Sequence, residues 1–199
     1  HGGVWRWEVG VRRSVKGPLV ACGNAIHACT LEQLFDWFGP AIWEISLEEP
    51  QDAGDKTVAR AGTLVRRMGW NSQTAQLFAA DCAARVVKQT QDTRCLSAIL
   101  AARLFAFGLI EAAAHAAAQA AAWDAAWAAQ DAARDAARAA AQAAAWDAVW
   151  DAAWAVWAVW AAERTWQVSR LAAYLSREVD LVKYREVVER DFLGERSKC

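Results

Sequence analysis

The stretch that decides the fold covers residues 109–169 and reads LIEAAAHAAAQAAAWDAAWAAQDAARDAARAAAQAAAWDAVWDAAWAVWAVWAAERTWQVS. Its 61 residues contain neither glycine nor proline. Thirty of them are alanine, the residue with the highest helix propensity. The composition predicts helix throughout, yet a single helix of this length would be roughly 90 Å long at ~1.5 Å per residue. Because the whole chain has only 199 residues, we expect this helix to break.

An internal repeat within this stretch favours two helices. Residues 116–127 read AAAQAAAWDAAW and residues 139–150 read AAAQAAAWDAVW, an offset of 23 residues with one difference. At about 100° per residue, the offset turns the second copy about 140° away from the first, so the two sets of tryptophans cannot share one face of a straight helix. Two antiparallel helices with a turn near residues 130–138 remove the conflict. The alternative is one long helix with a different partner on each side.

Shorter helices are predicted on both sides of this stretch. Asn71 or Ser72 is a suitable N-cap for a helix with apolar residues at helical spacing up to residue 87. A second helix is expected at about 94–107, with Gly108 as its stop. A last helix is expected at about 168–193, with Gly194 at the C′ position. Residues 71–199 therefore form an all-helical domain, an antiparallel bundle rich in alanine and tryptophan.

Residues 1–70 have a different composition. They hold all three prolines and nine of the eleven glycines, and short apolar runs lie between these breakers. Thr30 is expected to cap a helix that runs to Phe38 and ends at Gly39. Strands are predicted at 4–9, 18–22, 25–29 and 42–48, and as one or two strands at 57–68 around Gly62. The fold class is α+β, with a small sheet domain at 1–70 followed by the helical domain.

Eight tryptophans lie between residues 123 and 166, and their surface must be covered. Full burial at roughly 200 Å² each would contribute on the order of 40 kcal/mol before chain entropy is subtracted. The bundle core is one place for them, and an interface with another protein is the other. Aspartates follow tryptophan directly at 124, 147 and 151. The candidate partner-binding residues are Trp123, Trp127, Asp147, Trp150, Asp151 and Trp154.

Charge limits the classes of partner. The net charge is −1, which lacks the basic excess of a nucleic-acid binder or of a protein that sits on an anionic membrane. The uncharged runs in the apolar region, such as residues 152–162, are too short to span a bilayer. Residues 109–169 carry three arginines and seven acidic residues. They form either a solvated face or an acidic surface that recognises a basic partner.

Metal or thiol chemistry could use the group formed by Cys22, His27 and Cys29, with Cys82 or Cys95 as a fourth ligand. The spacing differs from that of common structural zinc sites, so we expect no metal and no cofactor. A catalytic cysteine–histidine pair would need a third, orienting group. Buried small thiols are the simpler interpretation. The odd count of five cysteines predicts reduced thiols and a cytoplasmic protein.

Two parts of the chain resemble known families. VACGNAIHACTLEQLFDWFGPAIWEISLE (20–48) and DKTVARAGTLVRRM (55–68) resemble a small uncharacterised domain of bacterial and phage proteins, with residues 25–29 matching its G-[FY]-H-x-C strand. WNSQTAQLFAADCAARVV (70–87), the Ala/Trp helices and ERTWQVSRLAAYL (163–175) resemble the helical domain of Imm-5-like immunity proteins. The second resemblance implies a protein that binds and neutralises another protein. The N-terminal strand order is similar to that of ADP-ribosyltransferase folds, although the catalytic glutamate of that pattern is missing.

These observations lead to three functional hypotheses. The first is a non-enzymatic binding protein of the immunity or inhibitor type, which occludes a partner protein such as a toxin or a host or phage factor. The second is an enzyme of the ADP-ribosyltransferase type, with His27 near a nicotinamide pocket. The third is a structural protein of a phage or mobile element that self-assembles into a homo-oligomer through its tryptophan stripes.

Overall fold

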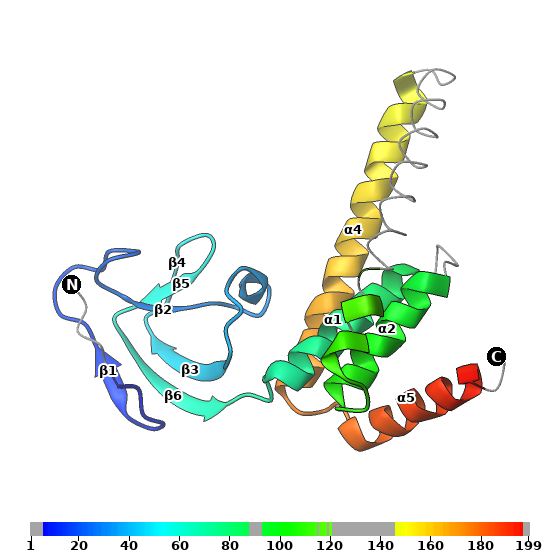
Figure 1. Ribbon diagram of the computed structural model, residues 1–199. Coiled ribbons are helices and arrows are strands. Elements are labelled where there is room, and N and C mark those ends of the chain that lie inside the picture. Colours follow the sequence, from blue (N-terminus) through cyan, green and yellow to red (C-terminus); the bar gives the residue numbers. More distant parts are fainter. Residues whose placement is uncertain (1–5, 88–92, 115, 119, 121–145, 197–199) are drawn as a thin grey trace. The chain divides into compact units, whose positions relative to one another are not determined.

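A computed structural model describes residues 6–87, 93–114, 116–118, 120 and 146–196, with the side chains of 86, 87, 146–160, 195 and 196 left outside the description. The strands lie in the N-terminal part of the chain and the long helices follow them, which confirms the α+β class (Figure 1). The chain divides into two compact units. One unit extends to Asn71 and includes Ala172–Glu178, and the other contains Ser72–Leu171 and the residues from Val179 onward.

The first unit contains two antiparallel sheets of three strands each. Strand order is β1-β6-β3 in one sheet and β2-β5-β4 in the other. The bounds of the strands are β1 Arg12–Ser14, β2 Ile26–Ala28, β3 Trp43–Glu48, β4 Gln51–Asp52, β5 Thr57–Ala59 and β6 Ala61–Arg67. Only Arg60 separates β5 from β6, so these consecutive strands connect the two sheets. Buried apolar side chains on these two strands, such as Val58 and Leu64, form part of the core of the unit.

The predicted strands at 25–29 and 42–48 are confirmed as β2 and β3, and the 57–68 region forms two strands. Their break falls at Arg60 rather than at Gly62. Gly62 lies inside β6 at a place where neighbouring side chains leave little room for a Cβ. A Cβ there would be 3.0 Å from Leu47 Cδ2 and 3.1 Å from Ile45 Cδ1.

The strand predicted at 18–22 is wrong, because this segment is a turn in which Cys22 adopts a φ of +65°. The strand predicted at 4–9 is also wrong in its described part, where only Val9 forms an isolated bridge, to Leu64. Paired strand β1 lies just after it, and the prediction did not include β1.

The helix predicted from Thr30 to Phe38 is shorter than expected. It is the 3₁₀ helix η1, Gln33–Asp36. The predicted cap at Thr30 does form. The Thr30 backbone N–H donates to Gln33 Oε1 at 2.9 Å, and the Gln33 N–H donates to Thr30 Oγ1 at 3.3 Å. This reciprocal pair is a capping box, and it satisfies two backbone donors at the start of the turn.

The second unit is built mainly from α1 (Ser72–Val87), α2 (Thr93–Ala106), α4 (Trp146–Leu175) and α5 (Leu181–Arg196). The first two helices match the predicted bounds within a residue or two. Gly108, at φ +67°, ends α2 as predicted, because the N–H groups of Gly108 and Leu109 close back onto Phe105 and Leu104 at 2.9 Å each. The turn predicted near 130–138 lies outside the described residues.

The single last helix predicted at 168–193 is wrong, because the chain breaks between α4 and α5. Arg177 takes a φ of +63°, and the Glu178 N–H donates to the Ala173 carbonyl at 2.9 Å, which closes the end of α4. Asp180 then caps α5, as its Oδ1 accepts the N–H groups of Val182 and Lys183 at 3.1 Å each. Gly194 is not a C′ residue, since α5 continues through it to Arg196.

No helix in the described part of the chain is both long enough and apolar enough to cross a membrane.

Candidate functional site

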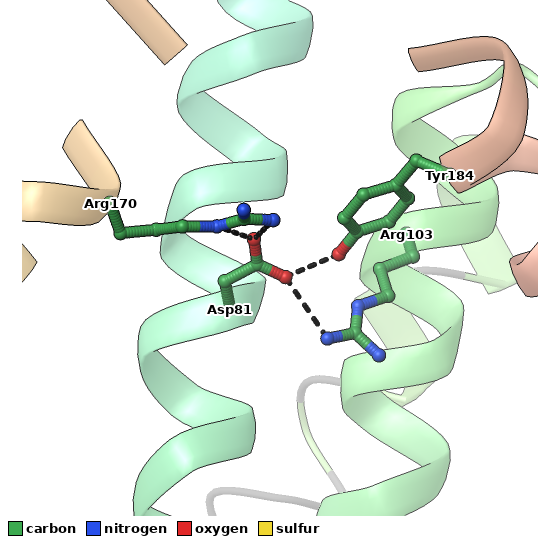
Figure 2. A network of polar contacts seen from close by, with 4 residues as sticks. All are labelled: Asp81, Arg103, Arg170 and Tyr184. Atoms are coloured by element: carbon green, nitrogen blue, oxygen red, sulfur yellow. Dashed lines mark hydrogen bonds and ion pairs between the residues drawn. The ribbon is translucent and has the colours of Figure 1, made fainter. Parts of the chain in front are cut away.

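Four helices of the second unit meet around one buried carboxylate, Asp81 of α1 (Figure 2). Arg170 of α4 donates from Nε and Nη2 to Asp81 Oδ2 at 2.9 and 2.7 Å. Arg103 of α2 donates to Oδ1 at 3.1 Å, and the hydroxyl of Tyr184 of α5 donates to the same oxygen. We call these four residues the Asp81 cluster. It connects helices whose contributing residues are up to 103 positions apart in sequence.

Burial determines the chemistry of the Asp81 cluster. The Asp81 side chain is only 7% exposed, so its charge must be compensated by the protein. Burial, followed by hydrogen bonding to Asp81, raises the pKa of Tyr184 well above its usual range. Tyr184 therefore stays a protonated donor at neutral pH. Because both carboxylate oxygens are occupied, the geometry suits a structural connection between helices and does not leave Asp81 open for proton transfer.

An open cavity of about 750 Å³ lies beside the Asp81 cluster and is lined by all four helices. We call it the helical groove. Its lining residues are Asp81, Ala84, Arg85, Leu96, Ile99, Leu100, Arg103, Trp166, Arg170, Arg190, Asp191 and Gly194.

Trp166 and four arginines are among the residues that line the helical groove. The Arg85 guanidinium lies 4.7 Å from the centre of the Trp166 ring and forms an ion pair with Glu163 at 2.5 Å. Two cations share the single charge of Asp81, and the buried Nε of Arg103 has no hydrogen-bond partner within the described part of the chain. The groove wall therefore places arginine guanidinium groups beside an aromatic surface.

A second candidate site lies in the first unit, at the turn that contains Cys22. The Gly23 N–H donates to the Val20 carbonyl at 2.9 Å, which places Cys22 at the third position of a β-turn. A positive φ at this position is normally taken by glycine. The backbone N–H of Cys22 donates to Nε2 of His27 at 3.1 Å. His27 of β2 thus holds the turn in place, and in its neutral form the ring proton lies on Nδ1.

Lys56 occupies the other side of this turn. Its ammonium lies 5.1 Å from the centre of the Trp37 ring and 3.3 Å from the Asp55 carboxylate. Hydrogen bonding to the Cys22 sulfur is the largest cause of the raised pKa of Lys56. Cys22, Lys56 and Trp37 line a cavity of about 400 Å³ together with His27, Ala28 and Cys29. We call this cavity the thiol pocket.

The two cysteines of the thiol pocket are in different environments. Cys22 is an exposed free thiol, whereas Cys29 is half-buried. Burial raises the pKa of Cys29. Within the described ranges, no group of three or more histidine, cysteine or acidic side chains is arranged to hold a metal ion. The structure joins Cys22 and His27 through a backbone hydrogen bond.

The candidate partner-binding residues predicted from the tryptophan pattern are only partly placed. Trp123 and Trp127 lie outside the described residues. Asp147, Trp150, Asp151 and Trp154 belong to α4 by their backbone, and their side chains lie outside the description. Their role as a binding surface stays a prediction.

Sequence reasoning missed the Asp81 cluster, although a signal for Asp81 was present. Asp81 follows Leu77 by four residues and Phe78 by three, so it lies on the apolar face of its helix. A charged residue on such a face needs a buried partner. No comparable signal identifies those partners, because Arg103 and Arg170 lie in other helices.

No protein-family model, curated protein or solved structure matches the chain.

Proposed function

We propose that this protein is a non-enzymatic binding protein that occludes a surface of a partner protein, as immunity and inhibitor proteins do. The helical groove is the binding site in this proposal. The observation that carries it is the groove itself, an open cavity to which four helices contribute aromatic, aliphatic and arginine side chains. A cavity of about 750 Å³ accommodates several side chains from a partner.

The chemistry of the groove suits protein recognition. Tryptophan and arginine are the residues most enriched at the energetic centres of protein interfaces. Trp166 and Arg85 form such a pair at the groove wall, and Arg85 is 42% exposed although it is stacked and ion-paired. Leu96, at 46% exposed, gives the same groove an apolar rim. A partner side chain could bury Leu96 without displacing the Asp81 cluster.

Charge favours an acidic segment on the partner. The groove is lined by four arginines (Arg85, Arg103, Arg170 and Arg190) and two aspartates (Asp81 and Asp191), and this excess of cationic side chains suits a carboxylate on the partner. The acidic face expected on residues 109–169 would attract a basic surface. A partner with an acidic segment and a basic surface would therefore complement both the helical groove and this face. The protein then blocks the functional site of the partner if that site lies within the surface that the groove binds.

A matched pair of variants tests this proposal. Leu96→Asp places a negative charge on the exposed rim of the groove, and Val182→Asp places the same charge on α5 at a side chain that is 73% exposed and does not line the groove. Both variants and the wild type are used as bait in lysate of the cells that make the protein. Captured proteins are identified by mass spectrometry, and the affinity of the purified partner is measured by calorimetry.

We expect one stoichiometric partner with the wild type and with Val182→Asp. The affinity of Leu96→Asp for that partner falls at least tenfold, because a charge must be desolvated in the groove. Equal affinity for both variants would remove the groove from the proposal. Capture of the bait alone, with a mass in solution that rises with concentration, would replace the proposal by self-assembly.

A further inference from the structure

Strand β3 of the first unit is an edge strand with one free side. The strand order β1-β6-β3 places β6 on one side of β3 and no strand on the other. Within the described ranges, no backbone hydrogen bond joins residues 43–48 to a segment other than β6. Such an edge presents backbone N–H and C=O groups on which an extended segment of another chain can add as a further strand.

The hydrogen bonds at the start of β3 show which backbone groups face this free side. The Met68 N–H donates to the Ile42 carbonyl at 3.0 Å, so the groups of Ile42 face β6. Consecutive residues of an antiparallel strand alternate between facing their partner strand and facing away from it. The backbone N–H and C=O of Trp43, the next residue, therefore point to the free side.

An open cavity of about 690 Å³ is lined by β3 and by other residues that all belong to the first unit. Three exposed tryptophans, Trp7, Trp37 and Trp43, are among its lining residues, together with apolar side chains such as Ile45 and Leu64. We call it the tryptophan cavity. Exposed aromatic side chains around one cavity offer a large apolar area to a side chain of a partner.

Two glutamates of β3 make its free edge acidic. The Glu44 carboxylate accepts from Arg66 at 2.6 Å, and the Glu48 carboxylate accepts from Arg12 at 2.6 and 2.7 Å. Both arginines belong to strands on the inner side of β3, and the two carboxylates are still 43% and 52% exposed. A strand added outside β3 would therefore meet two accessible carboxylates at its edge.

We propose that β3 binds an extended segment of another protein in which basic residues alternate with large apolar residues. The segment adds as a further strand to the sheet β1-β6-β3. Its basic side chains lie beside Glu44 and Glu48, and an apolar side chain enters the tryptophan cavity. This surface belongs to the first unit and is independent of the helical groove.

A second copy of the chain fits this edge less well. Because side chains alternate along a strand, pairing that keeps the apolar faces of two β3 strands together also brings their glutamates onto one face. Like charges on neighbouring strands repel, whereas opposite charges stabilise the pairing. The acidic edge therefore favours a basic segment over self-association.

The first test selects ligands for the full-length protein from a library of random octapeptides displayed on phage. We expect enrichment of peptides in which lysine or arginine alternates with large apolar residues. A selected peptide is then synthesised with a fluorescent label, and its affinity is measured by fluorescence anisotropy. A library that yields no peptide of this alternating pattern overturns the proposal.

N-methylation of the selected peptide tests whether it binds as a strand. Only every second N–H of an added strand donates to β3, so methylation of one alternate set should weaken binding about tenfold or more. Methylation of the other set should leave the affinity within about threefold of that of the unmodified peptide. Equal effects of the two sets would show that the peptide does not pair with the edge of β3.

Variants of the protein locate the bound peptide. The double variant Glu44→Gln and Glu48→Gln should weaken binding about three- to tenfold, because two pairs of opposite charges are lost. Glu189→Gln removes an acidic side chain from a similarly exposed ion pair in the second unit and should bind as the wild type does. Unchanged affinity in the double variant would remove β3 from the proposal.

Two further variants separate the tryptophan cavity from the helical groove. Trp43→Ala, with its fold checked by circular dichroism, should weaken peptide binding about tenfold, because a large part of the apolar contact is lost. Leu96→Asp changes the groove and should leave peptide binding unchanged. A peptide that loses affinity for Leu96→Asp and keeps it for Trp43→Ala binds the groove, and this result would contradict the proposed edge site.

Discussion

The Asp81 cluster and the thiol pocket both combine charged side chains, yet they differ in how completely those charges are used. Asp81 is 7% exposed and has donors from three other helices on its two oxygens. In the thiol pocket, Cys22 is exposed, and Lys56 is shared between a sulfur, a carboxylate and an aromatic ring. A buried carboxylate held by several donors stabilises a fold, whereas a pocket whose thiol and carboxylate are largely exposed contributes less to stability.

The largest expected effect comes from removing the carboxylate of the Asp81 cluster. Asp81→Ala leaves Arg103 and Arg170 without their shared anion and should lower the free energy of unfolding by about 3–5 kcal/mol. The corresponding change in the thiol pocket, Asp55→Asn, should cost less than about 1 kcal/mol because the Asp55 carboxylate is 54% exposed. Urea denaturation of both variants measures the difference. Equal losses would mean that the two regions do not differ in the way described.

A smaller effect is expected at Tyr184. Tyr184→Phe removes a hydrogen bond to a charged acceptor and should cost about 1.5–3 kcal/mol at neutral pH. The pKa of Tyr184 is raised in the folded protein, so its contribution is present below the ordinary tyrosine pKa of about 10 and is lost as pH rises beyond it. Unfolding measured at pH 8 and pH 11 should show a smaller gap between wild type and variant at the higher pH. A constant gap would argue against this linkage.

Cys82 should produce a weaker dependence at slightly lower pH. Its pKa is raised from 9.0 to about 11, first by burial and then by Asp81. Because the unfolded thiol ionises first, the wild type loses stability as pH rises from about 9 to about 11. Cys82→Ala should flatten the stability curve in this window. Differential scanning fluorimetry across the window provides the measurement.

The smallest effect is expected from the backbone of the thiol pocket. Cys22 has a φ of +65°, a conformation that glycine adopts without strain. Relief of this strain outweighs the greater entropy that glycine adds to the unfolded chain, so Cys22→Gly should stabilise the protein by up to about 1 kcal/mol. Thermal unfolding against Cys22→Ala, which keeps the strain, isolates the backbone effect. A loss of stability in the glycine variant would show that the thiol itself holds the turn.

Local sequence signals predicted much of the fold. Thr30 with Gln33 and the stop at Gly108 each depend on residues close in sequence, and both form as expected. The break after α4 is not predicted, although Asp180 is a good N-cap, because apolar residues at helical spacing continue on both sides of it. The positive φ of Arg177 could not be predicted from the sequence, since the tertiary fold sets this conformation at an arginine.

The candidate sites were harder to predict because their residues come together only in three dimensions. Asp81 is separated from Arg170 by 89 positions and from Tyr184 by 103. Cys22, His27 and Cys29 were recognised as a group from their spacing, but Lys56 joins them only through the fold. The sequence therefore suggested the two cysteines and the histidine as a group. It could not show that Lys56 lines the same pocket.

The most direct test of the proposed function is hydrogen–deuterium exchange of the protein with and without its purified partner. The groove is lined by α2 and α5 as well as by α1 and α4. We therefore predict slower exchange on partner binding in residues 93–106 and 181–196, with the strands of the first unit unchanged. Protection confined to the strands around the thiol pocket, with no change in these two helices, would contradict the proposed function.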